Sequence, residues 1–194
     1  MKNNILIILS VLLYSSVSQA ETESWYFNAS IGLANKHNPY SVEQVISSAE
    51  NTYGVSRVSI SVDYGFYWPV FSESLILGVV SNASVDSVQD NNFNEVVAHD
   101  LKYRGISVIK FIENTVGEGL FVRGDVGQAS AKYRYSGNAF EAGDGSGSAT
   151  LIGVGYGKPL TGNRTRIIFS FNTIRSSIDS REFNSNQFMA GVMW

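Results

Sequence analysis

The sequence predicts an all-β fold: an eight-stranded antiparallel transmembrane β-barrel with short periplasmic turns and longer extracellular loops. Three observations carry this prediction. Apolar and polar residues alternate in eight separate segments, which is the period of a strand with one apolar face. The connections between these segments alternate between short and long, and aromatic residues gather at the strand ends nearest the short connections.

The composition excludes several other classes of protein. The chain has 194 residues, 14 Lys and Arg, 17 Asp and Glu, a formal net charge of −3 and no Cys. Without Cys there is no disulfide scaffold, thiolate metal site or cysteine nucleophile. The slightly acidic balance argues against a nucleic-acid partner, because such proteins carry a surplus of basic residues.

The first twenty residues read as a secretory signal peptide. Lys2 precedes the apolar run Ile5–Leu13, and small residues at Ser18 and Ala20 fit a cleavage site after Ala20. The run is shorter than the roughly 20 residues that a spanning helix needs. We therefore expect residues 1–20 to be removed and residues 21–194 to form one barrel domain.

In the first four predicted strands, most of the alternate positions are apolar. These strands are Trp25–Leu33, Val58–Trp68, Leu75–Val85 and Leu101–Phe111. In the fourth, Leu101, Tyr103, Ile109 and Phe111 oppose three basic residues, so the sequence predicts apolar residues toward lipid and basic residues toward the lumen.

The last four predicted strands follow the same rule. They are Leu120–Gln128, Thr150–Tyr156, Thr165–Thr173 and Asn186–Trp194. Short connections are expected at 69–74, 112–119 and 158–164, and longer loops at 34–57, 86–100, 135–149 and 174–185. Aromatic residues at the ends near the short turns predict a periplasmic girdle, because an amphipathic ring suits the interface of water and lipid. This girdle comprises Trp25, Trp68, Phe111, Tyr156 and Trp194.

The last strand, Phe188–Trp194, is the most specific part of a family resemblance. With the segments Phe121–Gly127 and Gly153–Gly157, it resembles the small outer-membrane β-barrels, the group of the OmpA transmembrane domain, OmpX and Ail. The resemblance implies an outer-membrane location of the Gram-negative type, with lipid and lipopolysaccharide as surroundings. It also implies that Phe188, Ala190, Val192 and Trp194 form the signal read by the barrel-assembly machinery. A soluble lipocalin-type barrel is the structural alternative, and it would need an apolar interior.

Charged residues on the polar faces are expected to point into the lumen. They are Arg57, Asp63, Lys102, Arg104, Lys110, Arg123, Asp125 and Arg166. Eight strands enclose a space that side chains can fill, and an unpaired buried charge costs several kcal/mol. The sequence therefore predicts a lumen charge network that plugs the barrel. Because basic residues outnumber Asp in this set, a narrow anion-preferring pathway stays open as the alternative.

Two basic residues at the outer end of the fifth strand stand apart. The alternation points Lys132 and Arg134 outward, where each would cost about 2–4 kcal/mol at mid-depth in lipid. We expect them to lie above the hydrocarbon as candidate lipopolysaccharide contacts. A β-bulge near Gln128 that turns them inward is the competing interpretation.

The sequence favours a non-enzymatic role. The two histidines, His37 and His99, show no pairing typical of a lipid A deacylase, and two loop histidines are poor evidence for a metal. His37 and the pair Asp86-Ser87 only mimic the order found in a palmitoyltransferase of lipid A. We expect no cofactor, no metal and no catalytic residue, and a monomer that acts in envelope structure or in surface interaction, such as adhesion, through its loops. A small porin and a lipid A-modifying enzyme remain the alternatives.

Overall fold

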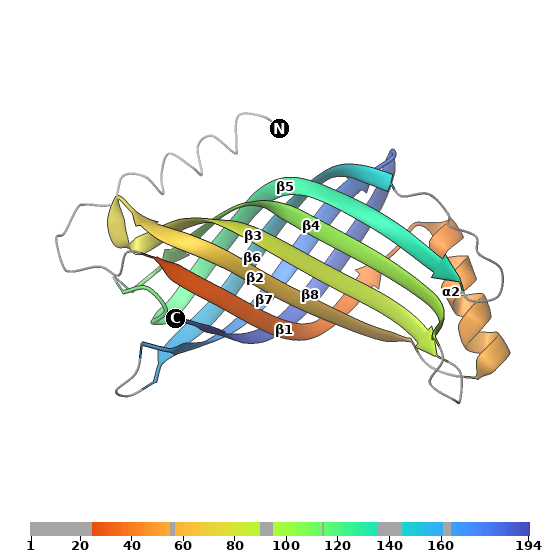
Figure 1. Ribbon diagram of the computed structural model, residues 1–194, viewed down its shortest axis with the longest axis horizontal. Helices are drawn as coiled ribbons and strands as arrows, with labels where there is room; N and C mark the ends of the chain where they lie inside the picture. Colours follow the sequence, from red (N-terminus) through yellow and green to blue (C-terminus); the bar gives the residue numbers. More distant parts are fainter. Residues whose placement is uncertain (1–24, 55–56, 90–94, 114, 136–144, 161–163) are drawn as a thin grey trace.

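The protein is a closed barrel of eight antiparallel strands in sequence order, in which β1 pairs with both β2 and β8 (Figure 1). This computed structural model describes residues 25–54, 57–89, 95–113, 115–135, 145–160 and 164–194. The predicted fold class is confirmed. The proposed signal peptide lies outside the described residues.

The eight strands differ in length. They are β1 (Tyr26–His37), β2 (Val58–Val70), β3 (Ser72–Gln89), β4 (Glu95–Phe111), β5 (Gly119–Tyr135), β6 (Gly145–Pro159), β7 (Arg166–Ile178) and β8 (Arg181–Met193). Strands β3, β4 and β5 have 18, 17 and 17 residues, whereas β1, β7 and β8 have 12, 13 and 13. One side of the wall is therefore longer than the other.

A helix, α2 (Tyr40–Tyr53), lies at one end of the barrel, and the C-terminus lies at the other (Figure 1). We call these ends the mouth and the base. The helix occupies the segment expected to be a long loop, and it ends at Gly54, whose left-handed backbone (φ 64°) lets its N–H bond to the carbonyl of Glu50. Within the described residues, no helix combines the length and the apolar composition needed to cross a membrane.

The outer surface of the barrel carries an apolar belt. Its exposed side chains include Trp25, Ile31, Leu33, Ile60, Val62, Tyr64, Phe66, Trp68, Leu77, Val79, Ile106, Leu120, Val122, Val126, Ile152, Val154, Tyr156, Phe169, Phe171 and Phe188. Apart from Trp25, which precedes β1, each lies two positions from the next on its strand or opposite a neighbour on the adjacent one. Such a band of exposed apolar residues is what a strand presents to lipid.

Four of the five residues predicted for the aromatic girdle are exposed, and the fifth, Phe111, is not. Trp25, Trp68, Tyr156 and Trp194 are exposed at the base. Phe111 is fully buried, and its ring packs against Phe121 inside the barrel with centroids 5.2 Å apart. The reason is that Phe111 lies on the inward face of β4, together with Leu101, Tyr103 and Ile109.

The pairing of the last strand with the first closes the barrel wall, and at the base this seam ends at Phe27 and Trp194. Backbone hydrogen bonds join Phe27 and Trp194 in both directions at 2.7 and 3.0 Å, and their rings lie 4.7 Å apart. Phe188, Ala190 and Val192 share the outward face of β8 with Trp194. Their role as an assembly signal stays a prediction.

Two of the expected long loops are short. Strands β7 and β8 meet at Asp179 and Ser180, both with positive φ (47° and 62°), as in a two-residue hairpin turn. Strands β3 and β4 extend to Gln89 and from Glu95, so only residues 90–94 separate them. The chain uses these segments to lengthen the wall rather than to form loops.

A pair of glycines on β4 and β5 permits a close approach of the two backbones, and it generates a stability prediction. Gly105 pairs with Gly127, and a Cβ on Gly127 would press into the backbone carbonyl of Arg104. We expect Gly127→Ala to lower the free energy of unfolding by about 1–3 kcal/mol, because the backbone must move. Gly124 on the same strand has open space around it, so Gly124→Ala is the matched control. The temperature at which the folded band disappears in SDS gels measures both, and equal temperatures for the two variants would contradict the close approach.

Candidate functional site

A buried ion cluster fills the middle of the lumen. The Arg123 guanidinium, from β5, donates to both oxygens of Asp63 on β2 at 2.7 and 3.0 Å. It also donates to Asp125, two residues along its own strand, at 2.7–3.0 Å. All three residues are at most 5% exposed. The cluster joins two strands that are not neighbours in the barrel, so it crosses the lumen.

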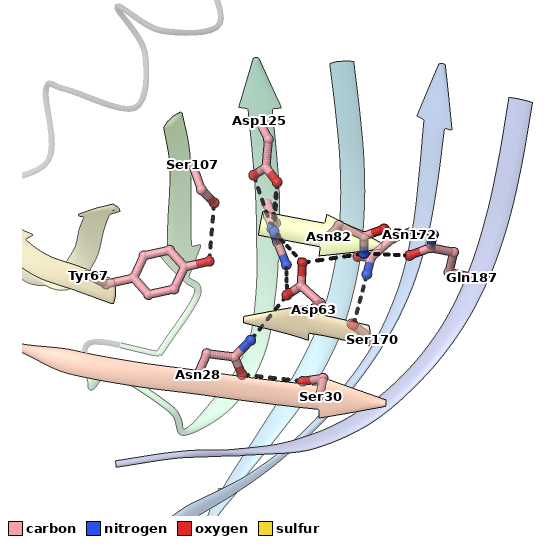
Figure 2. A network of polar contacts seen from close by, with 11 residues as sticks. Asn28, Ser30, Asp63, Tyr67, Asn82, Ser107, Asp125, Ser170, Asn172 and Gln187 are labelled. Carbon is pink, nitrogen blue, oxygen red and sulfur yellow. Dashed lines mark hydrogen bonds and ion pairs between the residues drawn. The ribbon is translucent and has the colours of Figure 1, made fainter. Parts of the chain in front are cut away.

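Amide side chains from three further strands surround this cluster (Figure 2). Asn28 on β1 and Asn82 on β3 donate to the two oxygens of Asp63 at 3.2 and 3.4 Å. Asn82 and Gln187 on β8 exchange hydrogen bonds at 3.0 and 3.2 Å. These donors matter because one guanidinium faces two carboxylates, and a buried carboxylate needs hydrogen bonds to offset the loss of water.

Apolar side chains close the lumen on the base side of the cluster. Tyr67, Ile76 and Phe111 are fully buried there, together with Phe121 and Met193. The Tyr67 hydroxyl donates to Ser107 at 3.4 Å. The interior is thus ionic at the centre and apolar toward the base, rather than polar throughout as the alternation suggested.

A second polar layer lies between the cluster and the mouth. The Lys36 ammonium is buried, donates to the backbone carbonyls of Ser84 and His99 at 3.0 and 3.1 Å, and lies 3.6 Å from an Asp86 oxygen. Ser59 also donates to Asp86. The sequence prediction missed Lys36 as a site residue. The signal that could have identified it is its position in the alternating pattern of β1.

His99 is buried in this layer without polar contacts of its ring. The imidazole stacks between Tyr133 and Phe183, with centroids 4.5 and 5.6 Å away, and is 0% exposed. Neither ring nitrogen has a hydrogen-bond partner in the described part of the chain. Burial in an aromatic slot favours the neutral ring, so this histidine acts as a packing group.

The helix α2 covers the mouth and is held by charged contacts. Val42, Ile46 and Ala49 are buried on its inner face, at the i, i+4 and i+7 spacing of an amphipathic helix. The Arg57 guanidinium donates to both Glu43 oxygens at 2.9 and 3.1 Å. Asn38 donates to Glu43 and to Asp86 at 3.3 and 3.2 Å, which links the helix to the layer beneath it.

Five of the eight residues predicted for the lumen network are placed elsewhere. Arg57 ties α2 to the start of β2, as described above. Arg166 lies at the base, where it donates to the carbonyl of Val116 at 2.9 Å and covers the Tyr26 ring. Lys102 and Arg104 are exposed, and Lys110 lies on the same outward face and donates to Ser74 at 2.6 Å. Only Asp63, Arg123 and Asp125 come together.

The prediction for β4 was wrong because its inward face is apolar. Leu101, Tyr103 and Ile109 are buried, so Lys102 and Arg104 point away from the lumen. Toward the mouth this strand continues past Ile106, the last residue of the apolar belt on β4, and Lys102 and Arg104 are exposed there.

These outward residues form a cationic wall, defined here as Lys102, Arg104 and Lys132. Lys102 pairs with Ser130 and Asp100 with Lys132 on the neighbouring strands, so the three basic residues share one outward surface. The pairing of β5 runs without a register shift through Gln128, which excludes the bulge considered above. Lys132 is exposed. Arg134 has its backbone in this strand, and its side chain lies outside the described structure.

The geometry offers little support for catalysis. His37 is exposed on the outer wall, whereas Asp86 is buried in the lumen, so these two lie on opposite faces of the barrel. In the described ranges, no group of three or more His, Asp or Glu side chains is arranged to hold a metal ion.

The ion cluster predicts a specific stability defect. Arg123→Ala leaves two buried carboxylates without their cation, so we expect the free energy of unfolding to fall by about 3–5 kcal/mol. Arg104→Ala is the control on the outer wall and should change it by less than about 0.5 kcal/mol. Urea unfolding in lipid vesicles measures both. Equal effects of the two substitutions would show that the cluster contributes no special stability, and adding Asp63→Asn with Asp125→Asn to Arg123→Ala should recover part of the loss.

Comparison with known proteins identifies the architecture. No protein-family model matches the sequence, and no curated protein matches it either. Neisserial surface protein A (NspA) is similar in structure, with a TM-score of 0.55 and 13% identity over 88% of this chain and 96% of that one. Ail, the attachment invasion locus protein of Yersinia pestis, in complex with the heparin analogue sucrose octasulfate, has a TM-score of 0.53 and 12% identity over 89% of this chain and 100% of that one. The chain therefore resembles the small eight-stranded outer-membrane β-barrels, at a distant sequence identity.

Proposed function

We propose that the protein is a non-enzymatic outer-membrane barrel that anchors a surface for interaction with anionic ligands outside the cell. The observation that carries this proposal is the unequal wall. Strands β3–β5 continue past the apolar belt toward the mouth and present the cationic wall above it. The base, with its short connections and aromatic girdle, would face the periplasm.

The apolar belt supports the membrane location. Ile152, Phe188 and Leu33 are 73%, 69% and 69% exposed, although a soluble barrel would bury side chains of this size. The exposed tryptophans of the girdle suit the interface at the base. The resemblance to NspA and Ail supports the same placement.

The sealed lumen favours an anchor over a pore. Arg123 and its two carboxylates cross the lumen, apolar rings lie toward the base, and α2 covers the mouth. An ion passing through would have to displace the guanidinium from both partners, which leaves buried charges uncompensated. The small porin is therefore the weaker alternative.

The cationic wall supports an anionic ligand. On β4, Arg104 and Lys102 are the next outward residues beyond Ile106, the last apolar residue of the belt, and on β5 Lys132 lies beyond Val126, Gln128 and Ser130. Phosphate groups of lipopolysaccharide lie above the hydrocarbon in the outer leaflet, so Lys132 stays our proposed lipopolysaccharide contact, and Arg134 stays a candidate from the sequence alone. Ail was solved with a heparin analogue, and a sulfated ligand is a second anion that such a wall would attract.

Heparin retention tests the proposed function. We expect the refolded protein to bind immobilised heparin in low salt and to elute as salt rises, because exposed charges are screened. Changing Lys102, Arg104 and Lys132 together to Gln should weaken retention at least tenfold. Lys158→Gln, an exposed lysine near the base, is the matched control and should elute with the wild type.

Two results would count against the proposal. If the triple variant elutes at the wild-type salt concentration, the cationic wall is not the binding surface. If Lys158→Gln weakens retention equally, the interaction reflects net charge alone.

A further inference from the structure

We infer that a polar groove on the outer wall of β6, β7, β8 and β1 binds the saccharide headgroup of a glycolipid in the surrounding leaflet. The inference rests on the proposed membrane location and is independent of the cationic wall. In the ring of eight strands, this face begins at β6, the neighbour of β5, and continues away from the β4–β5 face.

The groove is built on a row of outward side chains in register across four strands. Thr150 pairs with Arg175, Arg175 with Asn184, and Asn184 with His37. The residues that alternate with this row along the strands, such as Ile174, are buried in the lumen. The paired row therefore faces outward. Four neighbouring strands thus place four polar side chains side by side.

A second row lies one step nearer the belt. Thr173 pairs with Asn186, and the Thr173 hydroxyl donates to the Asn186 amide oxygen at 2.9 Å. This bond holds the Asn186 amide beside Thr173. The two rows line a concavity of about 540 Å³, which is in the range of small-molecule sites.

The chemistry of the lining suits a sugar. Hydroxyl and amide groups supply donors and acceptors in turn, which sugar hydroxyls match. The charged residues on the lining are Arg175 and Glu182, one of each sign. A polyphosphate would call for several cations, as on the cationic wall, whereas this mixed lining favours a neutral or weakly charged saccharide.

The position of the groove favours binding of an amphiphile over binding of a free sugar, because exposed apolar side chains lie next to it. Two residues further along each strand, about 7 Å away, the outward side chains become apolar. Phe171 pairs with Phe188, with ring centroids 4.9 Å apart, and Leu33 pairs with Phe188 on the other side. A molecule with its saccharide in the groove would lay its acyl chain on these exposed apolar residues.

The test is a titration of the full refolded protein in detergent with three probes. The first is lipid A carrying inner-core sugars, the second is phosphatidylglycerol, which is anionic but lacks a sugar ring, and the third is the free inner-core oligosaccharide. One groove variant combines Asn184→Ala with Asn186→Ala, and a second combines Thr150→Val with Arg175→Met, so that a folding defect in one does not decide the result. Gln128→Ala is the matched control, because Gln128 is the first polar outward residue above the belt on β5.

We expect both groove variants to bind the glycolipid about tenfold more weakly, since each loses two hydrogen-bonding groups. Gln128→Ala should bind like the wild type, phosphatidylglycerol binding should not change, and the free oligosaccharide should bind more weakly than the glycolipid. Wild-type affinity of both groove variants for the glycolipid would overturn the inference, and so would an equal loss for phosphatidylglycerol. Heparin retention of the groove variants separates the two proposals. Loss of glycolipid binding with unchanged heparin retention concerns the groove alone, and loss of heparin retention in the triple variant with unchanged glycolipid binding concerns the cationic wall alone.

Discussion

The contact of Arg123 with Asp63 and Asp125 is the interaction on which the interior depends. Eight strands leave room for side chains and little else, so a guanidinium at the centre reaches carboxylates on both sides. Once charges are buried there, every remaining oxygen needs a donor. Asn28 and Asn82 supply donors from the neighbouring strands. The polar residues of five strands are thereby fixed around one cation.

The same closure explains how the two ends differ. Toward the base the lumen is packed with apolar rings, and the C-terminal strand joins the first strand through Phe27 and Trp194. Toward the mouth a second buried cation, Lys36, is satisfied by backbone carbonyls and Asp86, and Asp86 also accepts from Asn38 below the helix. The helix α2 is therefore connected to the barrel through polar contacts as well as through the buried side chains of Val42 and Ile46. A sealed interior leaves the outer wall as the surface on which binding can occur.

The fold could be predicted from the sequence because a barrel with an apolar outer belt requires apolar and polar residues to alternate along each strand. All eight strands, their order and most of the girdle follow from that alternation. The lumen residues were predicted less well, because β4 turns its large apolar side chains inward and its basic side chains outward. Lys102 and Arg104 are exposed on the outer wall, while Tyr103 and Phe111 are buried in the lumen. The helix α2 was missed, although Val42, Ile46 and Ala49 show helical spacing and Gly54 follows as a C-cap. Because this segment connects two predicted strands, it was assigned to a loop. The groove could not be predicted, because it depends on the register of four strands that only the closed barrel brings together.

Planar-bilayer conductance of the refolded wild-type protein tests the central claim, that the Arg123 cluster seals the barrel. The sealed barrel predicts that protein inserted in the bilayer gives no steady channels at neutral pH. Steady, discrete open channels of the wild type, with an ion selectivity that changes on substitution of Arg123, would contradict it and would assign the protein to the small porins.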